Sequence, residues 1–167
     1  MAGIFRQTGQ HGNYDQTVPV WKGAIAVAPS DLIYRDTVDG YDKPAALYPW
    51  TTDQATTLAA FHDVFRGVST TRRAATQTTD GGRTDGCPLT TGEFEYPCAA
   101  LGAAAVVGAL VTVAKQTGNA LESQKVAITT TLAEAIGILS EDAAVGATTI
   151  KFKIHPAIAN RGVQAIQ

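Results

Sequence analysis

The second half of the chain repeats the order of segments in its first half. The first half contains DLIYRD (31–36), HDVFRGVS (62–69) and GEFEYPC (92–98), and the second contains GALVTVA (108–114), AEAIGILS (133–140) and TIKFKIHP (149–156). Gly137 takes the place of Gly67, and the offset between equivalent segments falls from 78 to 70 and then to about 58 residues. Such similarity is typical of a duplicated unit, with shorter loops in the second copy. A duplicated β-unit that closes on itself predicts a small sandwich or barrel with one core.

The composition agrees with a β-rich fold. Hydrophobic residues make up 45% of the 167 residues and charged residues only 17%, and Thr, Gly and Ala are frequent. Such a composition suits strands and turns better than long, salt-bridged helices. We therefore predict a mainly β protein, a small β-barrel or sandwich with an internal pseudo-repeat, one short helix and extended N- and C-terminal arms.

The helix is predicted near residues 53–62, where Thr52 or Asp53 is able to cap its start. Four residues at helical spacing form its expected buried face: Ala55, Leu58, Ala59 and His62. Strict alternation marks two strands. Residues 92–97 place Phe94 and Tyr96 on one face, and residues 149–154 place Ile150, Phe152 and Ile154 toward the core with Lys151 and Lys153 toward solvent.

The two ends of the chain lack a sustained period of 2 or 3.6. We predict an N-terminal arm over residues 1–22, a β-barrel or sandwich domain over 23–155, and a C-terminal arm over 156–167. Large aromatic residues are uncommon in solvated tails, so the apolar residues of both arms are predicted to contact other chains. These residues are Ile4, Phe5, Tyr14, Trp21, Ile158, Val163 and Ile166.

The net charge of the chain argues against nucleic acid and anionic membranes as partners. The formal net charge is −2 and the isoelectric point is near 5.9, so the chain has no basic field for nucleic acid or anionic membranes. Residues 1–16 lack the features of a signal peptide, and synthesis in a cytoplasm is expected. Residues 98–114 are apolar but too short and too rich in Ala and Gly for a membrane span, and they are interpreted as a small-residue loop that leads into a buried strand.

No strong catalytic motif is present, and we predict neither enzymatic activity nor a cofactor or metal site. His62 and Asp63, with Arg66 nearby, are neighbours in sequence that point to different faces, so a structural role is favoured. Arg72 and Arg73 are expected to be solvated. Trp50 is assigned equally to core packing or to an interface.

The remaining polar signals are weak. Asp80 and Asp85 lie in a Gly-rich segment without the alternating oxygen ligands of a calcium loop. His155 most simply ends a strand before Pro156. Cys87 and Cys98 are interpreted as free thiols, and a disulfide between them stays an open alternative.

Several of these segments together resemble the head decoration, or capsid cement, proteins of tailed bacteriophages. They are WTTDQATTLAAFHDVFRGVS, TTGEFEYPC, VGALVTVA and LAEAIGILSEDAAVGATTIKFKI, and the similarity covers about residues 23–155. In that family a helix-like turn ends in an FxGV-type strand, a GxFEF strand follows, and a second copy carries an acidic DAAxG turn.

The resemblance implies a small β-barrel-like protein on the outer surface of an icosahedral head. Its expected partners are the major capsid protein and, in a homotrimer and through the terminal arms, neighbouring cement subunits, and its role is to stabilise the expanded lattice. Two alternatives remain. A β-barrel module that binds a glycan or host-surface ligand predicts a concave, aromatic-lined cavity. An enzyme would need convergent polar side chains with perturbed pKa values.

Overall fold

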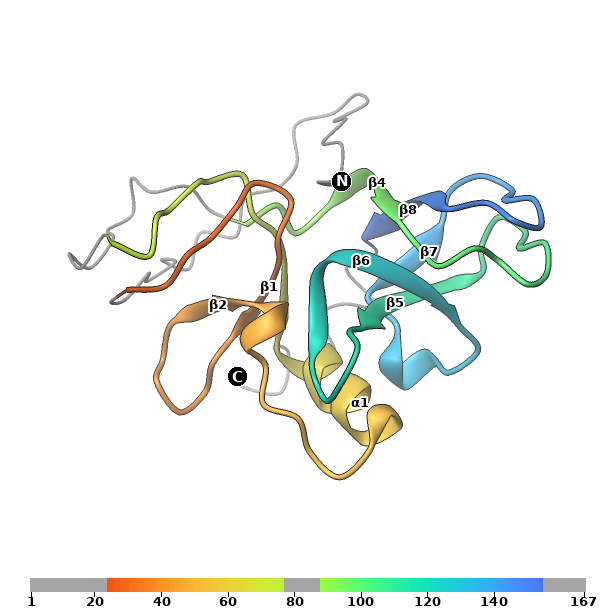
Figure 1. Cartoon of the computed structure of the whole chain (residues 1–167). Helices are drawn as coiled ribbons and strands as arrows, with labels where there is room; N and C mark the ends of the chain where they lie inside the picture. The colour runs from red at the N-terminus through yellow and green to blue at the C-terminus, as the bar shows by residue number, and fades with distance from the viewer. Residues whose placement is uncertain (1–23, 77–87, 155–167) are drawn as a thin grey trace, which may run out of the picture.

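A computed structural model of the protein describes residues 24–76 and 88–154 (Figure 1). The fold is mainly β, with one α-helix and a curled sheet that forms half of a barrel, which confirms the predicted fold class. The seven residues predicted to contact other chains lie outside the described residues. The strands are β1 (Leu32–Arg35), β2 (Asp42–Pro44), β3 (Phe65–Val68), β4 (Gly92–Pro97), β5 (Leu110–Lys115), β6 (Leu121–Thr129), β7 (Gly137–Leu139) and β8 (Thr149–Ile154).

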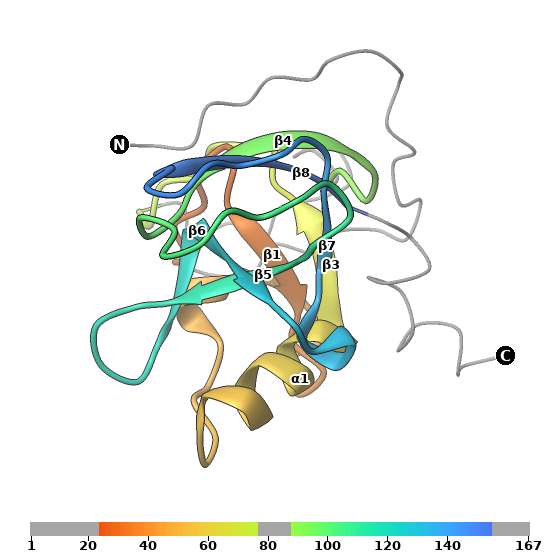
Figure 2. The same cartoon turned by 90° about the vertical axis from the view of Figure 1, so that its right-hand side faces the viewer.

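The strands form two antiparallel sheets. One has the order β2-β1-β3 and the other the order β4-β8-β7-β5-β6. Helix α1 (Gln54–Val64) and the short 3-10 turns η1 (Ala45–Leu47) and η2 (Leu132–Glu134) connect the strands. Figure 2 shows α1 below the strands, where it contacts β1, β5 and η2. The helix therefore covers one end of the half-barrel.

The pairing of strands confirms the predicted repeat. In the first half Ile33 of β1 lies opposite Gly67 of β3, and in the second half Val111 of β5 lies opposite Gly137 of β7. These pairs are related by the offsets of 78 and 70 residues that the sequence predicts. Each half also contains an isolated β-bridge beyond this pair, Val27 to Arg73 in the first half and Ala105 to Ala143 in the second. The residues of the two bridges are related by the same offsets.

The third predicted correspondence, between residues 92–98 and 149–156, is wrong. A Cβ atom added to Gly67 would lie 2.2 Å from the carbonyl oxygen of Leu89, and one added to Gly137 would lie 2.3 Å from that of Lys153. Strand β8 is therefore equivalent to the segment around Leu89. Strands β4 and β8 look alike because they pair with each other, Phe94 opposite Phe152, and both alternate between core and solvent.

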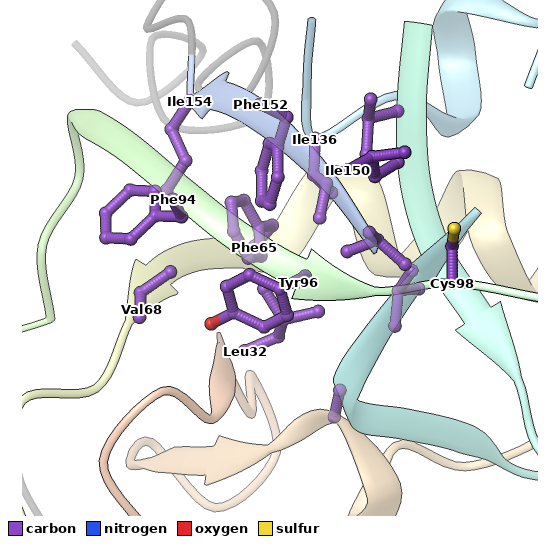
Figure 3. Packing of buried hydrophobic residues seen from close by; sticks show 14 of the residues in the cluster. Leu32, Phe65, Val68, Phe94, Tyr96, Cys98, Ile136, Ile150, Phe152 and Ile154 are labelled. Atoms are coloured by element: carbon purple, nitrogen blue, oxygen red, sulfur yellow. The ribbon is translucent and has the colours of Figure 1, made fainter. Parts of the chain in front are cut away.

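The two sheets and the helix share one main apolar core (Figure 3). Phe94 and Tyr96 of β4 pack against Phe152 of β8, with ring centroids 6.1 and 5.5 Å apart. Ile150, Phe152 and Ile154 are buried, and Lys151 and Lys153 are partly or fully exposed, as predicted. Alternation therefore identified the inner face of both strands correctly.

The helix begins where the sequence predicts. Asp53 is the N-cap, and its side chain accepts a hydrogen bond from the Thr56 backbone N–H. The buried face is rotated from the predicted one, since Ala55 is exposed and Thr57, Leu58, Phe61 and His62 are buried. The reason is Phe61, whose large ring packs against Tyr34, Tyr48 and Phe65 and so sets which side faces the core.

Candidate interaction surface

Each half of the protein contains the same tight turn just before its first strand. In the first half the Asp31 N–H donates to the Ala28 carbonyl, and in the second the Ala109 N–H donates to the Val106 carbonyl. The third residue of each turn has positive φ, 71° at Ser30 and 89° at Gly108. This is the pattern of a type II turn, with Pro29 at the second position of the first copy.

The last two residues of the turn in the first half are buried beneath β4 and β6, whereas Pro29 is exposed. The Tyr96 hydroxyl donates to the Ser30 carbonyl at 2.5 Å. The Gln124 side-chain amide donates to the Pro29 carbonyl at 3.3 Å and to the Asp31 carboxylate at 2.9 Å. Ser30 is only 3% exposed and Asp31 6%. Burial raises the pKa of Asp31, although hydrogen bonds from Ala28 and Gln124 oppose that shift.

The turn of the second half is exposed instead. Val106 is 65% exposed and Val107 60%. The loop that carries them lies beside the loop between β7 and β8, where Val145 is also 65% exposed, and both loops stand out at the right-hand end of Figure 1. We call residues 98–109 and 141–148 together the apolar tip. Large exposed apolar groups gathered in one place are characteristic of interaction sites.

Backbone hydrogen bonds join the two loops of the apolar tip along their length. Leu101 donates to Ala147 and accepts from Gly146, while Ala105 and Ala143 exchange a pair of bonds. At the base the Val107 N–H donates to the Asp142 carboxylate at 2.8 Å. The apolar tip is therefore ordered before any partner arrives, which lowers the entropic cost of binding.

The apolar tip has almost no charge. Residues 98–109 and 143–149 contain no Asp, Glu, Lys or Arg. Charge is confined to the rim, where Lys151 of β8 lies 3.0 Å from Glu141. Eight alanines and valines are exposed on the two loops: Ala99, Ala100, Ala103, Ala104, Val106, Val107, Ala144 and Val145. An apolar centre with a charged rim is the usual anatomy of a protein interface.

Sequence reasoning identified these segments but not their role. Residues 98–114 were interpreted as a small-residue loop that leads into a buried strand, and β5 confirms the strand. The exposed valines were missed, because an Ala- and Val-rich run is as consistent with burial as with exposure. The available signal was a second uncharged segment, residues 143–149, which follows the repeat segment 133–140.

His62 lies inside the fold. His62 is buried, and its Nδ1 atom lies 2.5 Å from the Ala135 carbonyl oxygen, which joins α1 to the segment after η2. Asp63, in contrast, is exposed. A shallow depression of about 410 Å³ lies beside them and is lined by Ala59, His62, Asp63, Leu132 and Ala133. It has none of the Phe, Tyr or Trp lining that the glycan-binding alternative predicts.

The other polar candidates are distributed over the molecule and do not meet in one site. Arg72 is exposed as predicted, but Arg73 is 5% exposed, which corrects the prediction that both are solvated. The backbone of Arg73 forms a β-bridge with Val27, and this pairing places Arg73 within the fold. Trp50 is partly buried against the core and carries the Lys115 ammonium 5.0 Å from its ring centroid.

Cys98 is a buried free thiol, and burial raises its pKa. Asp80, Asp85, Cys87 and His155 lie outside the described residues. Within residues 24–76 and 88–154, no cluster of His, Cys, Asp and Glu is suited to hold a metal ion. None of the helices in this same part of the chain has the length and hydropathy needed to cross a bilayer.

No protein-family profile matches the chain, and none of the curated proteins is significantly similar in sequence.

Proposed function

We propose that this protein is a structural component of a tailed-bacteriophage head, a cement protein that binds the outer surface of the icosahedral shell and stabilises the expanded lattice. The observation that carries the proposal is the duplicated unit. The motifs of the family resemblance fall at defined places in it, with FRGV in β3, GEFEYP in β4 and the DAAVG turn in the apolar tip.

The physical properties of the fold support the same role. A cement protein acts by binding the assembled shell more tightly than free subunits, so it stabilises the shell by mass action. Such a protein needs a rigid surface that is complementary to protein rather than to nucleic acid or lipid. The apolar tip meets that need, because backbone hydrogen bonds join its two loops and its exposed valines form an apolar surface.

The partners follow from the proposal. The protein binds the major capsid protein, assembles as homotrimers, and is located on the virion surface after synthesis in the host cytoplasm. The apolar residues of the terminal arms, from Ile4 to Trp21 and from Ile158 to Ile166, contact the shell or neighbouring cement subunits. No enzymatic activity is assigned.

Add-back to heads tests the proposal. Heads are purified from a lysate of a phage that lacks this gene, and the purified protein is added at increasing concentration. We expect saturable binding to expanded heads, additional density on their outer surface by electron cryo-microscopy, and a higher temperature of DNA release. Absence of binding, or recovery of the protein only in host cytosol during infection, would overturn the proposal. A chain lacking residues 1–22 tests the N-terminal arm, because equally tight binding would remove the arm from the contact.

A further inference from the structure

The part of the chain that the structure describes contains no counterpart of β4 in the first half. In the second half β7 pairs with β8, and β8 pairs in turn with β4 (Figure 1). In the first half β3 takes the place of β7. The segment around Leu89 takes the place of β8, because it forms a bridge with Val68 and closely approaches Gly67. The repeat therefore predicts one further strand beside the Leu89 segment.

The offset of 78 residues locates that strand in the sequence. It relates Val27 to Ala105 in the isolated bridges and Ile33 to Val111 in the first strands, so it holds along the segment that leads into each first strand. Strand β4 precedes the first strand of the second half. Moving β4 back by the same offset gives residues 14–19.

The sequence of residues 14–19 suits a strand in that position. It reads YDQTVP, and Tyr, Thr and Val are common in strands. Pro19 falls on Pro97, the last residue of β4, and proline is tolerated in an edge strand. Asp15 falls on Glu93, another acidic residue. Both correspondences agree with the offset of 78 residues.

The connection to β1 allows the strand to come from the same chain. Pro19 and Val27 are separated by as many residues as Pro97 and Ala105. In the second half this length carries the chain from the end of β4 to the isolated bridge. The same path in the first half therefore needs no second copy.

We propose that residues 14–19 add a strand to the β2-β1-β3 sheet of their own chain, beside the Leu89 segment, in the position that β4 holds beside β8. The repeat also gives the register. Glu93 lies opposite Lys153 in the second half, and Leu89 holds the place of Lys153. Asp15 is therefore expected opposite Leu89.

The repeat assigns the two faces of this strand as well. Val18 corresponds to Tyr96, which is only 1% exposed, so Val18 is expected to face the core. Thr17 corresponds to Glu95, which is half-buried on the opposite face of β4, so Thr17 is expected to face outward.

NMR of the full-length protein tests the strand directly. We expect slow hydrogen exchange at alternate amides of residues 14–19 and a nuclear Overhauser effect between the backbones of Asp15 and Leu89. A mixture of isotope-labelled and unlabelled chains identifies the source of the strand, because isotope-filtered spectra report only contacts between chains. Fast exchange throughout residues 14–19, a different neighbour for Asp15, or an Asp15–Leu89 contact between chains overturns the inference.

Substitutions at two adjacent positions test the faces. We expect Val18→Lys to lower the midpoint of urea denaturation by about 1 M, because a charge would be buried without a partner. Thr17→Lys is the matched control, and its midpoint stays within about 0.3 M of that of the unaltered chain. Equal midpoints for the two variants overturn the inference.

The outcome is separable from that of the proposed function, since these measurements use no phage heads. A protein that forms the strand but fails to bind heads retains this inference and loses the cement role, and one that binds heads without forming the strand does the reverse. Deletion of residues 1–13 removes Ile4 and Phe5 from any contact with the head and keeps the strand. Trp21 corresponds to Ala99, which is exposed, so the strand leaves Trp21 available to other chains.

Discussion

The hydroxyl of Tyr96 donates a hydrogen bond to the carbonyl oxygen of Ser30, 66 residues earlier in the chain. This bond is buried and joins β4 to the tight turn before β1, so it connects the two sheets. Burial also raises the pKa of Tyr96 well above its usual range, which keeps the hydroxyl protonated as a donor.

We expect Tyr96→Phe to lower the free energy of unfolding by about 1–2 kcal/mol, because the Ser30 carbonyl would stay buried without its donor. Urea denaturation measures the change. The control is Tyr41→Phe, since the Tyr41 hydroxyl makes no hydrogen bond among the described residues and its ring is half-buried. A loss in the control equal to that in Tyr96→Phe would contradict the assignment.

The close approach of strands at Gly67 and Gly137 makes both positions intolerant of a side chain. An added Cβ atom would overlap a backbone carbonyl oxygen at 2.2 or 2.3 Å, and backbone cannot move aside as a side chain can. We expect Gly67→Ala and Gly137→Ala each to cost at least about 3 kcal/mol in thermal or urea unfolding. Gly102→Ala is the control, because a Cβ atom there meets nothing within 4 Å. Equal stability of the three variants would be inconsistent with this packing.

Exchanging the residues at the third position of the two turns tests their equivalence. Ser30 has a φ of 71°, a conformation that favours glycine, and its counterpart is Gly108. We expect Ser30→Gly to stabilise the protein by about 0.5–1 kcal/mol and Gly108→Ser to destabilise it by a similar amount. The Tyr96 bond is unaffected, since it goes to a backbone oxygen. Destabilisation by Ser30→Gly in chemical denaturation would show that the two turns are not equivalent.

Ionisation of the Asp36 carboxylate makes the free energy of unfolding depend on pH, and the direction of the shift in its pKa gives the sign of that dependence. Partial burial alone would raise its pKa, but hydrogen bonds from Lys43 and from the backbone N–H groups of Asp39 and Val38 together lower it. The unfolded chain therefore binds a proton at higher pH than the folded protein. The contribution of Asp36 to the free energy of unfolding is complete above the ordinary pKa of about 3.9 and is lost as pH falls through the lower folded pKa.

NMR titration of the Asp36 side chain measures this shift. We expect Lys43→Met to raise the pKa of Asp36 toward its ordinary value, because the ammonium lies 2.6 Å from the carboxylate. Lys153→Met is the control, since Lys153 pairs with Glu93 instead. An Asp36 pKa that is the same in the unaltered chain and in Lys43→Met would exclude Lys43 as a cause.

The parts of the fold that sequence reasoning predicted are those where one local pattern decides the structure. Alternation placed Phe94 and Phe152 inward, and the capping residue placed the start of α1 at Asp53. Strand β6 was missed because its residues, LESQKVAIT, are mostly half-buried and do not alternate. Strand β2 was missed because it ends at Pro44 within a segment that has the composition of a turn.

The candidate surface was less predictable for a related reason. Whether Val106 faces the core or solvent depends on which segments pack over it in the folded protein, and the neighbours of Val106 in sequence do not decide that. The turn at Pro29 and the turn at Val107 differ in residues but share geometry. Only the offset of 78 residues, which also relates the first strands of the two halves, connects them.

The pairing of β4 with β8 has a consequence for synthesis on the ribosome. Residues 98–148 separate the two strands, and translation at about 5–20 residues per second takes roughly 3–10 s to cover them. During that interval the nascent chain presents the rings of Phe94 and Tyr96 and the backbone of β4 without their partner in β8. Until β8 has been synthesised, the inner face and one edge of β4 are therefore available to other nascent chains on the same messenger RNA.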